Sequence, residues 1–224
     1  MSARKSRIWQ SFDNFESSMK AKLKLIYGYD DWIQTHIDEG WSAYLLTFMF
    51  APLRGTLNSK IPQMNKEVET FYSKLLTRVV RRPNSSCDKP ALIASFDLPV
   101  AKRNKVSSID AFVNDGLHVH AILLIPPNSR LRVPLAEHIE SNHEVYLRDR
   151  RKLDRIDVQP FYTEESFRVV DYVMKSIKKG RLDYDDSVLI LPRSSSECRD
   201  DFCQRERGVE GRRKSSMRSK KGRP

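Results

Sequence analysis

Residues 117–125 read Leu-His-Val-His-Ala-Ile-Leu-Leu-Ile. They predict a buried β-strand, because seven of the nine are apolar and two prolines follow them. Alternate side chains of a strand point to opposite faces. His118 and His120 therefore project side by side from one face, which Ile122 and Leu124 continue further along. The two imidazoles are expected at the mouth of a buried strand, where they can converge on one divalent cation.

Three further strands and several helices are expected around this strand. The strands are predicted at residues 43–50, 91–98 and 156–161. Apolar residues at three- and four-residue steps predict helices at residues 8–25, 64–80, 135–147 and 164–179, with a turn at 27–31 and a short helix reaching residue 37. This order predicts an α+β fold, a ferredoxin-like or RRM-like sandwich whose central antiparallel sheet is covered by helices on one face.

Charge and composition suggest three segments. Residues 1–40 form an N-terminal helical segment, residues 41–192 the main domain, and residues 193–224 a basic tail. Residues 205–224 hold nine Lys or Arg against two Glu, a net charge of +7 out of +11 for all 224 residues. Such a run cannot bury enough apolar surface to order itself, so we expect a disordered tail, either a solubilising end or an arm that binds phosphates.

The remaining composition favours a cytoplasmic protein. The three cysteines are scattered and include no Cys-x-x-Cys pair, so neither a disulfide framework nor a structural zinc site is expected. The longest apolar runs are far shorter than the roughly 20 residues of a membrane span, and the basic N-terminus has no apolar stretch behind it. We therefore expect no membrane association and a reducing compartment.

Two further segments contain side chains that could take part in chemistry. Tyr172 and Lys175 are three residues apart on a predicted helix and share one face, which Ser176 and Lys179 join. A phenol is a poor nucleophile unless a metal or base assists it, and a neighbouring lysine could hold a phosphate. Residues 45–50 form an apolar strand with one hydroxyl, that of Thr47. Taken singly, these patterns also fit half-exposed histidines, a packing tyrosine and an ordinary buried strand.

Taken together, in this order and spacing, the three segments resemble the HUH endonuclease superfamily, and within it the single-tyrosine replication initiators of plasmids and small phages. Residues 44–50 are similar to the first motif of that family, apolar residues around a threonine. His118-Val119-His120 matches its second motif, histidine–hydrophobe–histidine, and Tyr172 with Lys175 matches its tyrosine helix. The resemblance covers roughly residues 41–182.

The resemblance implies a metal-dependent endonuclease. His118 and His120 would bind Mg²⁺ or Mn²⁺ with a third ligand, for which Asp97 is the main candidate and Asp115 the rival. Tyr172 would attack a phosphate of single-stranded DNA and form a 5′-phosphotyrosine, with Lys175 steadying the phosphate. The expected function is nicking and joining that initiates rolling-circle replication of a plasmid or phage.

The expected partner is single-stranded DNA or a hairpin origin. The expected DNA-binding residues are the basic side chains of a long polar loop predicted at residues 99–116 and of the tyrosine helix, namely Lys102, Arg103, Lys105, Lys178 and Lys179. A separate helicase is also expected, because the sequence has no Gly-x-x-x-x-Gly-Lys-Ser/Thr loop for nucleotide phosphates.

Two alternatives stay open. The first is a single-tyrosine transposase of the same superfamily, which would prefer hairpin DNA. The second is a non-catalytic basic module that binds nucleic acid through a ferredoxin-like sheet. In that module His118 and His120 would be incidental, and no Mn²⁺ affinity is expected.

Overall fold

The computed structural model describes residues 3–83, 88–98, 113–147 and 152–193. Its centre is a five-stranded antiparallel sheet in the order β4-β1-β3-β2-β5. The strands are β1 (Ser42–Phe50), β2 (Ala91–Asp97), β3 (His118–Ile125), β4 (Leu153–Phe161) and β5 (Val188–Leu191). The predicted α+β class with an antiparallel sheet is confirmed, and β3 lies at its centre.

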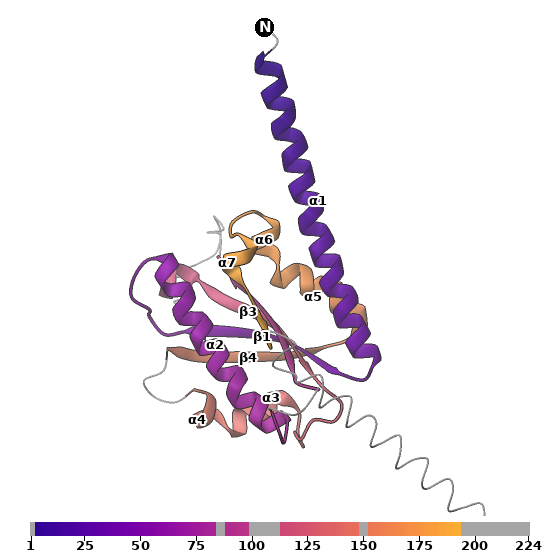
Figure 1. Cartoon of the computed structure of the whole chain (residues 1–224). Coiled ribbons are helices and arrows are strands. Elements are labelled where there is room, and N and C mark those ends of the chain that lie inside the picture. Colours follow the sequence, from indigo (N-terminus) through magenta and orange to yellow (C-terminus); the bar gives the residue numbers. More distant parts are fainter. Residues whose placement is uncertain (1–2, 84–87, 99–112, 148–151, 194–224) are drawn as a thin grey trace, which may run out of the picture.

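Helices lie on both faces of the sheet, not on one face as the sequence suggested (Figure 1). One face carries α2 (Leu57–Val79), α3 (Leu135–Ser141) and α4 (His143–Tyr146). The other carries α1 (Ala3–Asp38), α5 (Ser166–Val173) and α6 (Lys175–Lys178). The strands explain the second layer, since β2 and β3 are buried at every residue but the first and so need apolar cover on both sides.

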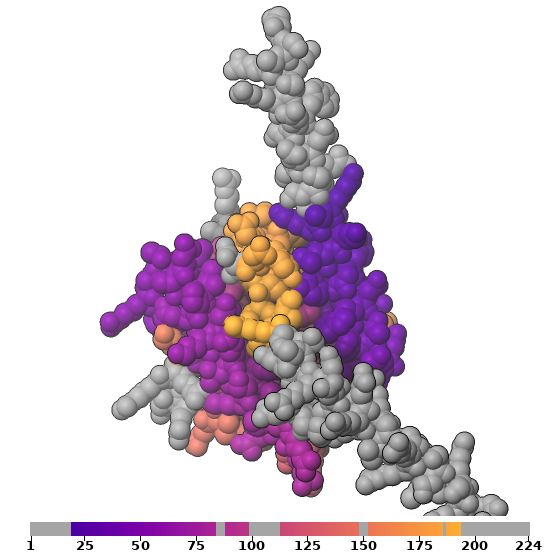
Figure 2. Space-filling view, in the orientation of Figure 1, coloured from indigo at the N-terminus to yellow at the C-terminus, as the bar shows by residue number. Residues whose placement is uncertain are grey.

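The two layers enclose two separate cores. Phe48 of β1 packs edge-to-face on Phe71 of α2, with ring centroids 5.1 Å apart, at the centre of the larger core. The smaller core joins Ile122 of β3 to Ile33 of α1 and Val170 of α5. In the space-filling view, the orange C-terminal segment lies against the indigo part of α1 (Figure 2). The smaller core therefore fixes α5, which carries Tyr172, on the sheet.

Helix α1 runs without a break through residues 27–31, where the sequence suggested a turn. The prediction of a helix at 8–25 followed by a short helix was therefore wrong. Ile26 and Ile33 are both buried on one side of this continuous helix, and Asp30 accepts a hydrogen bond from Ser166 of α5. These contacts outweigh the low helix propensity of the single glycine in the segment, which amounts to about 1 kcal/mol.

Other boundaries also differ from the sequence reading. Helix α2 begins seven residues before the predicted residue 64, the predicted 135–147 helix is divided at Asn142, and the predicted 164–179 helix is divided into η3 (Thr163–Glu165), α5 and α6. Two short helices, η2 (Val113–Gly116) and α7 (Tyr184–Ser187), and the strand β5 were not predicted. Short elements depend on tertiary contacts because they contain too few residues for a periodic pattern.

Candidate metal centre

The register of the sheet brings three polar side chains together. Asp97 at the end of β2 lies directly opposite His118 at the start of β3. His120 lies opposite Thr47 of β1. Because alternate residues share a face, all four side chains point towards the layer of α1, α5 and α6. Asp97 and His120 are buried, each with 3% of its surface exposed.

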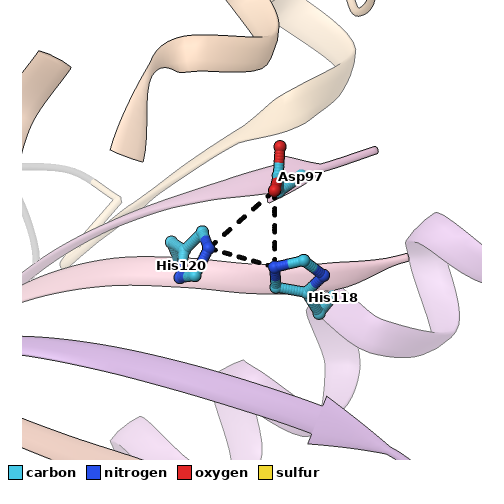
Figure 3. Close-up of side chains that lie close together, drawn as sticks. All are labelled: Asp97, His118 and His120. Atoms are coloured by element: carbon cyan, nitrogen blue, oxygen red, sulfur yellow. Dashed lines mark hydrogen bonds and ion pairs between the residues drawn. The ribbon is translucent and has the colours of Figure 1, made fainter. Parts of the chain in front are cut away.

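Asp97, His118 and His120 form a compact group whose possible ligand atoms all lie within 4.8 Å of one another (Figure 3). The Nε2 atoms of His118 and His120 are 3.0 Å apart. Asp97 Oδ2 lies 3.4 Å from Nε2 of His118 and 3.9 Å from Nε2 of His120. Two ligands at right angles around a cation, each about 2.1 Å from it, are about 3 Å apart, so the spacing of these atoms fits a shared metal ion.

Both histidines are oriented by hydrogen bonds on their other ring nitrogens. His118 Nδ1–H donates to the carbonyl oxygen of Gly116 over 2.8 Å, which leaves the Nε2 lone pair facing the group. His120 Nδ1 is hydrogen-bonded to Thr47 Oγ1 over 3.0 Å. Metal-binding histidines usually have such a partner, because it fixes the ring orientation and the tautomer.

The Asp97 carboxylate is held in its ionised form. Lys175 Nζ lies 2.7 Å from Oδ2, and the Ser176 hydroxyl donates to Oδ1 over 2.8 Å. Burial by itself would raise the pKa of Asp97, but the hydrogen bonds from Lys175 and Ser176 and the nearby positive charge outweigh it and lower that pKa. A carboxylate in this state can act as a ligand without first losing a proton.

His120 is held in its neutral form. Burial lowers the pKa of its imidazole to about 3, and the neighbouring His118 and Lys175 add to the shift. Metals bind the neutral imidazole, so this environment keeps the ring in the state that can coordinate an ion.

Tyr172 and Lys175 lie against this group. The ring centroid of Tyr172 is 4.6 Å from that of His120, and Lys175 Nζ lies 4.1 Å from the centre of the Tyr172 ring. The chain leaves α5 at Met174 and begins α6 at Lys175. Tyr172 remains 42% exposed, so the phenol is accessible from solvent next to the buried group.

The other predicted site residues are not part of the group. Asp115, the rival third ligand, lies in η2, where it forms an ion pair with Lys60 and its side chain is 87% exposed. Lys178 pairs with Asp171, and Lys179 is exposed. The remaining predicted DNA-binding residues, Lys102, Arg103 and Lys105, lie outside the described residues.

Sequence reasoning did not assign a role to Ser176 or to the hydroxyl of Thr47, although both contact the group. The sequence singled out Thr47 as the one hydroxyl in an otherwise apolar stretch of strand, but it did not predict the hydrogen bond to His120. Ser176 could have been found from its position one residue after Lys175, but only the tertiary structure places it beside Asp97.

The fold and this group define an α+β protein with a buried Asp–His–His cluster that could hold a metal ion. Comparison of the chain with protein-family models, with curated proteins and with solved structures gave no match. Within the described ranges, no helix has the length and apolar character needed to cross a membrane.

Proposed function

We propose that the chain is a metal-dependent endonuclease of the HUH type that nicks and rejoins single-stranded DNA through Tyr172. The observation that carries the proposal is the contact between Tyr172, a half-exposed phenol, and the buried Asp97–His118–His120 cluster. These residues come from three elements far apart in the sequence, namely β2, β3 and α5. A nucleophile beside a metal cluster is the arrangement that phosphoryl transfer through tyrosine requires.

His118, His120 and Asp97 would hold Mg²⁺ or Mn²⁺. Two imidazoles and one ionised carboxylate leave room for oxygen ligands from a phosphate or from water, which suits Mn²⁺ and Mg²⁺. When bound, the cation would polarise the phosphate and offset the charge that develops on it. The hydrogen bonds to Thr47 and Gly116 keep both rings aimed at the cluster before any ligand arrives.

Tyr172 would supply the nucleophile. Its phenolic oxygen forms a bond to phosphorus while the bond from phosphorus to the 3′ oxygen breaks. The phenol loses its proton to solvent, and the leaving 3′ oxygen gains one. The products are a 5′-phosphotyrosine and a free 3′-hydroxyl, and attack by a 3′-hydroxyl on the phosphotyrosine reverses the step and joins the strands.

Lys175 would stabilise the phosphate next to Tyr172, since its ammonium group lies between the tyrosine ring and Asp97. The exposed Lys179, together with Lys178 and the basic residues Lys102, Arg103 and Lys105, would add contacts to the DNA backbone. In this proposal the protein initiates rolling-circle replication of a plasmid or phage, and a separate helicase unwinds the duplex.

The test is a search for a covalent protein–DNA adduct. The full chain is incubated with a broad pool of single-stranded oligonucleotides and Mn²⁺, and a denaturing gel separates the products. We expect a slower-migrating adduct that is absent with EDTA and absent in Tyr172→Phe. Tyr162→Phe is the matched control, because Tyr162 is 67% exposed and lies outside the cluster.

An adduct that persists in Tyr172→Phe would contradict the assignment of the nucleophile. If wild type forms no adduct with either Mg²⁺ or Mn²⁺ and binds no Mn²⁺, the non-catalytic binding module becomes the better reading. A strong preference of the adduct reaction for hairpin DNA would favour the transposase.

A further inference from the structure

A pocket of about 410 Å³ opens beside the Asp97–His118–His120 cluster on the same face of the sheet. Its floor is formed by side chains of β1 and β4, and Arg168, Val169 and Tyr172 of α5 form a wall. Thr47 and Tyr172 line the pocket and also contact His120, so the pocket adjoins the cluster directly. The volume lies within the range of about 300–1,000 Å³ that is typical of small-molecule sites.

The lining combines flat apolar surfaces with groups that accept hydrogen bonds. Phe161, Pro160 and the Tyr172 ring supply the apolar surfaces. Asp157 and Gln159 are alternate residues of β4, opposite Thr47 and Leu45, and so lie side by side in the floor. An aromatic heterocycle with hydrogen-bonding groups along one edge matches this combination.

The acceptors point to one base in particular. Asp157 offers a carboxylate, which only accepts hydrogen bonds when ionised, and its side chain is 48% exposed. Arg155 Nε forms an ion pair with Oδ2 of that carboxylate over 3.4 Å, a long contact between two half-exposed side chains. Guanine presents two neighbouring N–H donors, N1–H and the 2-amino group, which a carboxylate can accept together. The other DNA bases present a single donor group on that edge.

A carboxylate in a cleft that faces a DNA backbone is otherwise unfavourable, because phosphates and carboxylates repel each other. Arg168 at the wall is paired with Glu165 over 2.9 Å, so a second acidic side chain also lines the pocket. Acidic side chains here are consistent with the recognition of a base, and the phosphates would be held at the cluster and by Lys175.

We propose that this pocket binds an unstacked guanine of the strand that Tyr172 attacks, with Asp157 accepting from N1–H and the 2-amino group and Gln159 contacting the same base. The pocket would then select the position of the nick. Tyr162, an exposed aromatic residue that follows Phe161 in the chain, would stack on a neighbouring base. The inference rests on the proposed function for the presence of DNA at the cluster and for the nick that the bound base would position.

The test measures binding without chemistry. Fluorescence anisotropy in EDTA compares the affinity of the full chain for short oligothymidylates that contain a single guanine, hypoxanthine or adenine. Hypoxanthine lacks only the 2-amino group of guanine. We expect the guanine oligonucleotide to bind roughly tenfold more tightly than the hypoxanthine one, the scale of one well-made contact to a base edge.

Asp157→Asn should bring the ratio of the affinities for the guanine and hypoxanthine oligonucleotides close to one, and Gln159→Ala should reduce that ratio. Asp154→Asn is the matched control, because Asp154 is an exposed carboxylate on the same strand that does not line this pocket. Using the ratio removes the uniform gain in DNA affinity that any lost negative charge produces.

Equal affinities for guanine and hypoxanthine, a ratio that survives in Asp157→Asn, or no binding to any of these oligonucleotides would overturn the guanine pocket. These outcomes are separate from the adduct test. An adduct that depends on Tyr172 without a guanine preference would leave the nickase standing and remove the pocket. A guanine preference without any adduct would leave the guanine pocket standing and remove the nickase.

Discussion

Lys175 should compete with a metal ion for Asp97. Its ammonium group lies 2.7 Å from the carboxylate oxygen that faces both histidines, and the two side chains are only 25% and 4% exposed. A cation that uses this oxygen must displace or weaken that contact. We therefore predict that Lys175→Met binds Mn²⁺ more tightly than wild type, although it should form less covalent adduct.

The size of the effect follows from the contact. A hydrogen bond between charged groups contributes about 1.5–3 kcal/mol, and about 1.4 kcal/mol corresponds to a tenfold change in affinity. Lys175 keeps some contact with solvent, so the lower end applies, and we expect roughly a tenfold gain. Loss of the positive charge near the cation acts in the same direction.

Isothermal titration of the full chain with Mn²⁺ measures the dissociation constant. Lys178→Met is the matched control, because Lys178 pairs with Asp171 and does not contact Asp97. The melting temperature of each variant checks that the fold is retained. Mn²⁺ affinity that is unchanged or weaker in Lys175→Met would refute the reasoning, since the ammonium group would then not compete for the carboxylate.

Three further outcomes are expected. Ser176→Ala should weaken Mn²⁺ binding by roughly tenfold in the same titration, because the hydroxyl orients the Asp97 carboxylate; unchanged affinity would exclude that role. In EDTA, the free energy of unfolding should fall as the pH drops from about 6.5 towards 3, by up to about 1.4 kcal/mol per pH unit. The reason is that His120 binds a proton in the unfolded chain over this range, whereas in the folded protein its pKa of about 3 keeps it neutral. Denaturant titrations of His120→Gln should give a shallower slope over this window, and an identical slope would show that His120 is not responsible. Phe71→Ala should lower the free energy of unfolding by about 3–5 kcal/mol in urea, because a fully buried ring is lost; a change below 1 kcal/mol would contradict its place in the core.

Strand periodicity was sufficient to predict that His118 and His120 point to the same face. Residues that lie two apart on a strand must share a face, and that rule holds for any chain that forms the strand. The apolar run around the pair predicted its burial, and the structure has β3 at the centre of the sheet. The α+β class followed from the order of the elements in the same way.

Helix continuity was harder to predict. Tyr27-Gly28-Tyr29 has the composition of a turn, yet α1 continues through it because Ile26 and Ile33 pack on the sheet and on α5. Local propensity contributes about 1 kcal/mol at such a position, and burial of two large apolar side chains contributes more. The seven-residue spacing of Ile26 and Ile33 is that of one helix face, but only the tertiary structure shows which side chains bury them.

The residues of the site also differ in whether the sequence or the tertiary structure determined their placement. The sequence by itself determined that His118 and His120 point together, because the cause is the local geometry of one strand. The resemblance to the HUH superfamily also favoured Asp97 over Asp115 as the third ligand, since Asp97 lies at the end of a predicted strand. The placement of Asp97 opposite His118, with Lys175 and Ser176 on its carboxylate, was decided only by the tertiary structure. Strand pairing and helix docking join residues that are distant in the chain, and no local periodicity records those contacts.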